Sequence, residues 1–117
     1  MYSYFVDLPD EDKKAVLSGW LSFVLNEIEA GSLKIALRGA MFGNEVLIIN
    51  IDEAVKCSPP DMLMNAKSEY ITSLLWKYDL LLESSVSIRR KVGVWRHGTV
   101  FSMPKLVEFL AQYGSDA

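Results

Sequence analysis

Half of the 117 residues are hydrophobic and 23% are charged, a composition that excludes a disordered chain and favours a folded globular domain. The formal net charge of −3 argues against nucleic acid as a partner unless a local basic patch overcomes it. The longest apolar runs, at 46–49 and 80–82, are too short to span a bilayer, and the chain starts without a basic, apolar leader. We therefore expect one cytoplasmic domain over residues 1–117.

Residues 9–31 predict a long amphipathic helix. Apolar residues recur there at the three-and-four spacing that gathers one helical face: Val16, Leu17, Trp20, Leu21, Val24, Leu25 and Ile28. The acidic run Asp10–Asp12 falls in the first turn, where its charges meet the positive end of the helix dipole. Gly31 supplies a C-terminal stop. Gly19, inside the helix, suggests close packing against a neighbouring element.

A β-hairpin and a second helix are expected next. Residues 32–39 alternate apolar and polar side chains, which indicates a half-buried strand. After a turn at 40–44, residues 44–52 are apolar on both sides, which indicates a strand in the centre of a sheet. Residues 61–82 then carry a helical stripe of apolar residues, with Pro60 near the first turn.

The last third predicts two strands and a short closing helix over 104–114. We expect a two-residue turn at His97 and Gly98, because Arg96 then faces Thr99 and the apolar alternation agrees with the register. This register gathers one apolar face, formed by Val86, Ile88, Val92, Val94, Phe101 and Met103, and leaves Trp95 on the other. His97, the only histidine, is then the tip of a hairpin.

These elements give an α+β fold. The predicted order is helix-strand-strand-helix-strand-strand-helix, with an antiparallel sheet packed against two long helices. Residues 1–58 hold nine acidic and five basic residues, whereas residues 59–117 hold six acidic and seven basic ones. The basic residues Arg89, Arg90, Lys91 and Arg96 form the clearest charge cluster. Beside Trp95 they suit RNA or an acidic protein, or form a solvated outer sheet face.

Few residues are candidates for catalysis. Cys57, the only cysteine, lies between a predicted strand and a predicted helix start, where a thiol pKa can be lowered. A pair of Cys57 with His97, or of His97 with Asp52, is the available catalytic arrangement. Unpaired cysteines are more often buried and inert. No ligand spacing for a metal and no cofactor-binding motif is present, so we predict neither.

The leading hypothesis is a non-enzymatic protein-binding module, a small acidic bacterial inhibitor of the immunity-protein or antitoxin type that neutralises a basic toxin domain. Acidic binders reach basic nucleases quickly through electrostatic steering. The expected partner-binding residues are acidic or aromatic: Asp10, Glu11, Asp12, Phe42, Asp52, Glu53 and Trp95, with Tyr2 and Tyr4 as further aromatic anchors. The alternatives are a small hydrolase or nucleic-acid-processing enzyme using Cys57 and His97, and a chaperone or adaptor that binds an extended peptide.

Overall fold

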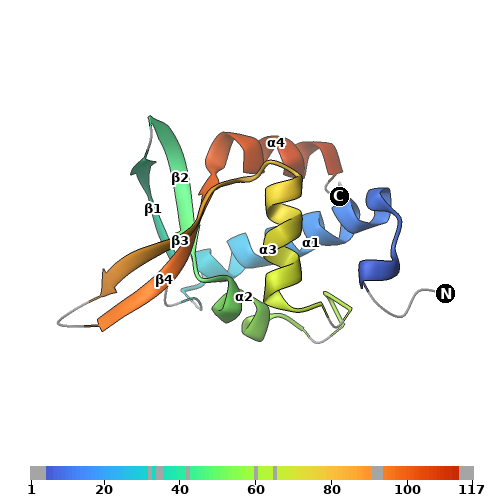
Figure 1. Ribbon diagram of the computed structural model, residues 1–117, viewed down its shortest axis with the longest axis horizontal. Coiled ribbons are helices and arrows are strands. Elements are labelled where there is room, and N and C mark those ends of the chain that lie inside the picture. The colour runs from blue at the N-terminus through green and yellow to red at the C-terminus, as the bar shows by residue number, and fades with distance from the viewer. Residues whose placement is uncertain are drawn as a thin grey trace.

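The computed structural model describes residues 5–31, 33, 36–41, 43–59, 61–64, 66–90 and 94–113, with the backbone alone at 36–37, 41, 84–90 and 94–97. This part of the chain contains a 3-10 turn, four α-helices and four strands (Figure 1). In chain order they are η1 (Phe5–Asp7), α1 (Asp10–Glu29), β1 (Ala36–Met41), β2 (Asn44–Ile49), α2 (Ile51–Cys57), α3 (Ser68–Lys77), β3 (Leu81–Arg90), β4 (Val94–Ser102) and α4 (Met103–Tyr113).

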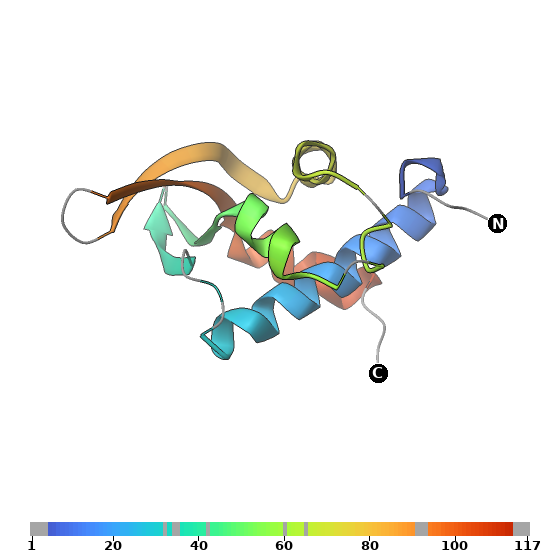
Figure 2. The ribbon, with the colours of Figure 1, turned by 90° about the horizontal axis from the view of Figure 1, so that it is seen from below.

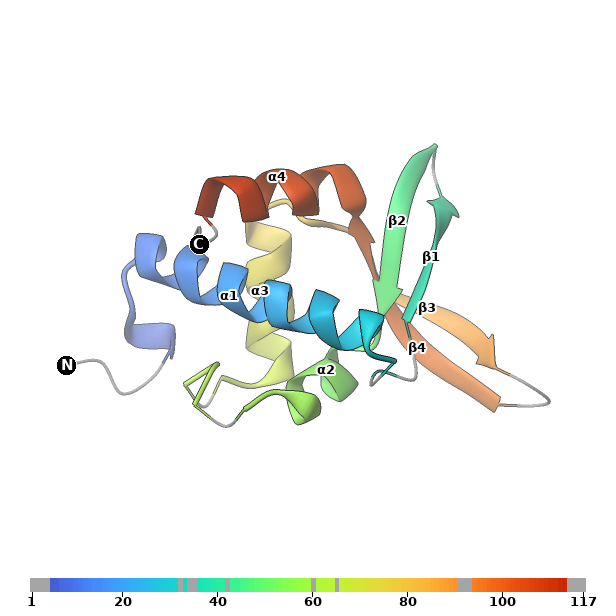
Figure 3. The same ribbon diagram turned by 180° about the vertical axis from the view of Figure 1, so that it is seen from behind.

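The four strands form one antiparallel sheet in the order β1-β2-β4-β3. The expected hairpin of β1 and β2 is confirmed, and so is the central place of β2, which lies between β1 and β4. Val46, Leu47 and Ile49 of β2 are buried, as expected for a strand covered on both faces. Helices α1 and α4 lie side by side and pack against the sheet (Figure 3). The α+β class is therefore confirmed.

One hydrophobic core joins the helices to the sheet. Its buried side chains come mainly from the helices and from strands β2, β3 and β4, and they include Leu17, Trp20, Leu21, Val24, Leu47, Ile49, Ile71, Leu74, Leu75, Leu81, Phe101, Leu106 and Phe109. Helix α3 crosses α1 at a steep angle and lies over one side of it (Figures 1 and 2). Within the described ranges, no helix combines the length and the apolar character needed to cross a bilayer.

Helix α1 matches its prediction closely. The apolar stripe predicted for it faces the core, and Gly31 follows the helix with a φ of 79°, in the left-handed region that ends helices. Gly19 is a correction. It is exposed, and a Cβ atom placed there would meet nothing within 4 Å, so it does not mark close packing.

The predicted second helix over 61–82 is wrong in its bounds. Helix α2 begins directly after β2, because Asn50 caps it by accepting a hydrogen bond of 2.8 Å from the Glu53 backbone N–H. Residues 61–64 form turns, and α3 starts only at Ser68. Asp79, with a φ of 63°, then turns the chain so that β3 begins at Leu81. Pro60 lies outside the described residues.

The predicted turn at His97 and Gly98 is also wrong. Strand β4 runs through both residues, with His97 opposite Ser87 and Gly98 opposite Val86. The outermost described pair is Arg90 with Val94, and residues 91–93 lie outside the described residues. The longer strand lets β4 pair with β3 and β2 together, which satisfies more backbone groups than a short hairpin would. Met103, expected in the strand, is the first residue of α4. The predicted side-chain faces over 84–97 lie outside what is described.

The outer part of the β3–β4 hairpin extends away from the helices (Figures 1 and 2). Strand β2 pairs with β4 only from Thr99 to Ser102, whereas the pairs between β3 and β4 continue to Val94. The projection contributes to an elongated shape, with principal extents of 48 × 28 × 25 Å.

Candidate protein-binding face around α3

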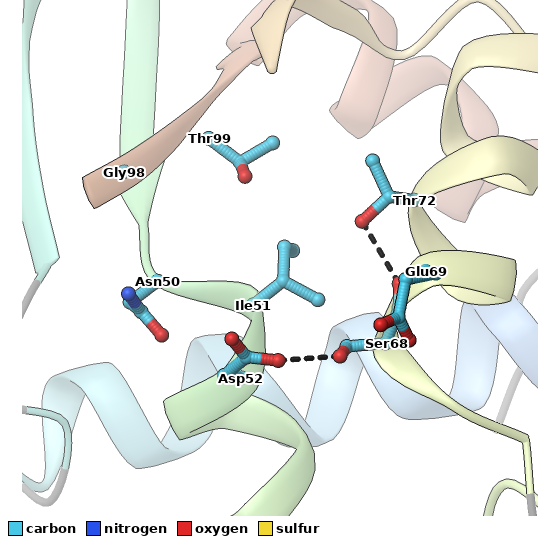
Figure 4. Close-up of a pocket in the computed structure, with 8 residues that line it drawn as sticks. All are labelled: Asn50, Ile51, Asp52, Ser68, Glu69, Thr72, Gly98 and Thr99. Carbon is cyan, nitrogen blue, oxygen red and sulfur yellow. Dashed lines mark hydrogen bonds between the residues drawn. The ribbon is translucent and has the colours of Figure 1, made fainter. Parts of the chain in front are cut away.

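Two hollows open on either side of the first turn of α3. The first, of about 400 Å³, is lined mostly by residues with polar side chains, so we call it the polar hollow, and it lies between α2, α3 and β4 (Figure 4). The second, of about 480 Å³, is mainly apolar and lies between η1, the turns before α3 and α3 itself. Glu69 lines both hollows and therefore stands between them.

The polar hollow is built from the N-terminal ends of two helices. Asp52 in α2 and Ser68 in α3 point toward one another, and the Ser68 hydroxyl donates a hydrogen bond to the Asp52 carboxylate (Figure 4). Thr72 donates from its Oγ1 to the Ser68 carbonyl at 2.9 Å. Gly98 and Thr99 of β4 close the opposite wall. Internal bonds thus hold α2 against α3 and leave Glu69 at the exposed rim.

The apolar hollow is lined by Phe5, Val6, Met64, Ala66 and Tyr70, with Lys67 and Glu69 at its edge. The rings of Phe5 and Tyr70 meet edge to face at 5.9 Å, and the Phe5 backbone N–H donates to the Met64 carbonyl at 3.3 Å. Val6 is 56% exposed, although it is aliphatic. The ring contact and the backbone hydrogen bond therefore hold the residues of this hollow in place, and the Val6 side chain beside them is accessible to a partner.

The outer face of α3 continues from these hollows. Glu69, Ser73 and Trp76 follow one another at the i, i+4 and i+7 positions of one helical stripe, and all three are exposed. Trp76 is 44% exposed, an unusual position for so large a ring. We call the surface formed by Val6, Asp7, Asp10, Asp52, Glu69, Ser73 and Trp76 the α3 face.

The predicted acidic residues are divided between the two ends of α3. Asp10, in the first turn of α1, forms an ion pair of 3.3 Å with Lys77 at the C-terminal end of α3. Asp52 bonds Ser68 at the other end, about 14 Å away by the rise of a helix. Glu11, Asp12 and the nearby Asp7 are exposed. The acidic residues therefore border α3 without forming a single cluster.

The other predicted partner-binding residues either differ in position from the prediction or are not fully described by the structure. Asp52 and Glu53 were expected in a loop after the second strand, but they lie in the first turn of α2 because Asn50 caps that helix. Trp95 lies opposite Arg89 in the outer part of the β3–β4 hairpin, and its side chain is outside the description. Phe42, Tyr2 and Tyr4 lie outside the described residues.

The structure does not give Cys57 the surroundings that the sequence suggested. Cys57 is exposed, and it is the last residue of α2 rather than a residue before a helix start. The following helix begins at Ser68. Gly98, next to His97, lines the hollow at the first turn of α2, about 9 Å along the helix axis from Cys57. Over the described residues, no three His, Cys, Asp or Glu side chains gather to hold a metal ion.

A separate cluster closes the junction of α1, α3 and α4. The Tyr78 ring stacks on Phe109 at 6.1 Å, and the Lys14 ammonium lies 5.4 Å from the Tyr78 ring and 4.9 Å from the Tyr113 ring. Burial of the Tyr78 hydroxyl, with a smaller effect from the negative charge of Asp10, raises its pKa to about 12. These contacts indicate a structural junction.

Sequence reasoning missed Val6, Glu69, Tyr70 and Trp76 as surface residues of interest. Trp76 was detectable, because it falls off the apolar stripe predicted for its helix. Val6 and Glu69 carry no such local signal, since the fold brings them together from distant parts of the sequence.

Comparisons of the chain with protein-family models, with curated proteins and with solved structures find no match.

Proposed function

We propose that this chain is a non-enzymatic protein-binding module and that its α3 face binds a basic protein surface. The observation that supports this is the combination of exposed apolar side chains with surrounding acidic ones. Val6 and Trp76 are exposed, a hollow of about 480 Å³ lies beside Val6, and Asp7 and Glu69 are exposed nearby. Protein interfaces commonly have an apolar centre with aromatic anchors and a polar rim.

Charge and apolar contact have separate roles in this proposal. Asp7 and Glu69 form no ion pair with the described residues, so their charges are available to a basic partner. The pair of Asp10 with Lys77 is exposed on both sides, and such pairs contribute about 0–1 kcal/mol, so a partner can replace it at little cost. The acidic residues accelerate association, whereas burial of Trp76 and Val6 prolongs the complex.

The specific form that we propose is a small cytoplasmic bacterial inhibitor of the immunity-protein or antitoxin type, with a basic toxin domain as its partner. Its support is the net charge of −3 and the concentration of acidic residues beside α3. The step from an acidic binding face to a toxin is an analogy with inhibitors of basic nucleases. The enzyme alternative has weaker support, because Cys57 lies at the opposite end of α2 from the strand that carries His97.

Binding to the purified product of the adjacent reading frame tests the proposal. We expect Trp76→Ala to weaken the complex at least tenfold, about 1.4 kcal/mol, mainly by faster dissociation. Glu69→Lys should slow association at low salt and have little effect at high salt. Glu108→Lys on α4 is the matched control, since it makes the same charge change at another exposed site.

Stopped-flow association and surface-plasmon-resonance dissociation provide the two rates, and thermal melting of each variant confirms that the fold is retained. Equal slowing by Glu69→Lys and Glu108→Lys would show that net charge acts without a defined face. Unchanged dissociation of Trp76→Ala would place the interface elsewhere.

A further inference from the structure

The outer part of the β3–β4 hairpin is a two-stranded ribbon that we call the arm, comprising residues 86–90 and 94–98. Within the described part of the sheet, β2 pairs with β4 only at Thr99–Ser102, so the arm has no third strand. Five residues per strand extend about 16 Å. The outer end of the arm projects away from the helices, whereas Gly98 at its inner end lines the hollow beside α2 and α3 (Figures 1 and 2).

The arm concentrates positive charge in a chain that is acidic overall. It carries Arg89, Arg90 and Arg96, which are three of the four arginines in the sequence, and the segment 84–107 contains no acidic residue. The remaining residues hold nine basic and 15 acidic side chains, a net charge of −6. The arm and the rest of the chain therefore have opposite charges.

The register brings these arginines close together along the ribbon. Arg90 pairs with Val94, Arg89 with Trp95 and Ile88 with Arg96, at three consecutive positions of the ladder. Three consecutive positions span about 7 Å of strand. The three arginines thus occupy the outer three of the five paired positions of the arm, toward the end that projects from the helices (Figure 1).

We propose that the arm binds double-stranded DNA through its phosphate backbone. Arginine presents a planar fork of donors that binds phosphate oxygens in pairs, so the three arginines of the arm suit a phosphate backbone. A two-stranded ribbon fits the major groove of B-form DNA, which is about 12 Å wide, whereas the major groove of an RNA duplex is too narrow.

The acidic remainder of the chain does not cancel this attraction. The positions of the three arginines lie about 10–17 Å along the ribbon beyond the last pair with β2, whereas the Debye length at physiological salt is about 8 Å. Charges on the helices are therefore screened at the end of the arm, and the local potential is set by its own arginines. This is the local basic patch that nucleic-acid binding requires in an acidic protein.

Fluorescence anisotropy with a short DNA duplex, an RNA duplex and a single strand of matching sequence tests the proposal. At about 50 mM salt we expect the DNA duplex to bind best, with affinity falling as salt rises at a slope of roughly −2.7, or −0.9 for each of three phosphate contacts. The triple variant R89Q/R90Q/R96Q should lose at least tenfold in affinity and most of the salt slope. The matched control R38Q/K56Q/K67Q removes three exposed basic residues outside the arm and should lose less than threefold.

Circular dichroism melting verifies that both variants keep the parent fold. Failure of the parent protein to bind the duplex under these conditions would overturn the proposal, and so would an equal loss in the arm variant and the control. Concentration-dependent self-association that the arm variant abolishes, without DNA binding, would instead assign the arm to a second copy of the chain. Neither result bears on the α3 face, which the Trp76 and Glu69 variants test separately.

Discussion

Gly19 lies on the exposed side of α1, where an added Cβ atom would meet no neighbour within 4 Å. Glycine inside a helix costs about 1 kcal/mol relative to alanine, because its backbone loses more freedom on folding. We therefore expect Gly19→Ala to raise the free energy of unfolding by about 1 kcal/mol, measured by urea denaturation with an unchanged m-value. Gly31→Ala is the opposite control. With a φ of 79°, it should destabilise by about 1 kcal/mol, and stabilisation by both changes would contradict this account.

For single residues, the sequence correctly predicted the backbone conformation where local geometry determines it. Gly31 ends α1 as expected, because a left-handed residue is a local requirement. His97 and Gly98 were assigned to a turn from the same kind of local evidence, and this was wrong. Their conformation is set by pairing with Ser87 and Val86, which are ten and twelve residues away in sequence. Local turn preference is weaker than a ladder of hydrogen bonds to a neighbouring strand.

Among the elements, α2 is attached to α1 by a pair of hydrogen bonds. The fully buried Trp20 donates from its Nε1 to the Ser58 hydroxyl at 2.7 Å, and that hydroxyl donates to the Ala54 carbonyl at 2.7 Å. Ser58→Ala should therefore destabilise by about 1–3 kcal/mol, because the buried indole N–H loses its acceptor. The control Ser73→Ala removes an exposed hydroxyl that bonds its own helix and should change stability by less than about 0.5 kcal/mol.

Chemical denaturation followed by tryptophan fluorescence measures both serine variants, and the Ser58→Ala spectrum should also change because the surroundings of Trp20 change. A loss for Ser73→Ala as large as that for Ser58→Ala would show that the hydroxyls act through helix propensity and not through the contact with Trp20.

The elements that were predicted well are those with a long, uninterrupted pattern. Helix α1 repeats its apolar spacing over 20 residues, and β2 is apolar on both faces. The stripe over 61–82 continued at helical spacing through Leu63 and Ala66, so no break was visible. Both residues contact the core, yet they lie in turns before α3. Burial and helical spacing coincide there without a helix, which periodicity alone cannot reveal.

At the scale of the whole molecule, Tyr78 reports on the junction of α1, α3 and α4. An unfolded tyrosine has a pKa of about 10, whereas the folded Tyr78 has a pKa of about 12. Because the unfolded state loses the proton first, this contribution to stability is complete below about pH 10 and is lost as pH rises through about 12. We expect Tyr78→Phe to reduce the alkaline loss of stability, because the variant has no phenol to deprotonate at this junction.

Absorbance titration of the phenolate band in the parent and in Tyr78→Phe measures this effect, together with melting temperatures over the same pH range. Removal of Tyr78 should delete the most alkaline step and leave the others in place. Identical alkaline profiles for the two proteins would mean that the junction stays closed for other reasons.

The pairing of β2 with β4 also affects how the chain can fold while it is being synthesised. Residues 46–49 of β2 pair with residues 99–102 of β4, fifty or more positions later in the chain. The β1–β2 hairpin can form as soon as it leaves the ribosome, but its second edge stays open until β4 has also been synthesised and has left the ribosome. That edge carries Val46, Leu47 and Ile49, which are buried in the finished fold. Open apolar edges recruit other chains, and distant pairing slows folding. Chains released after α3 should therefore aggregate more than chains released after α4.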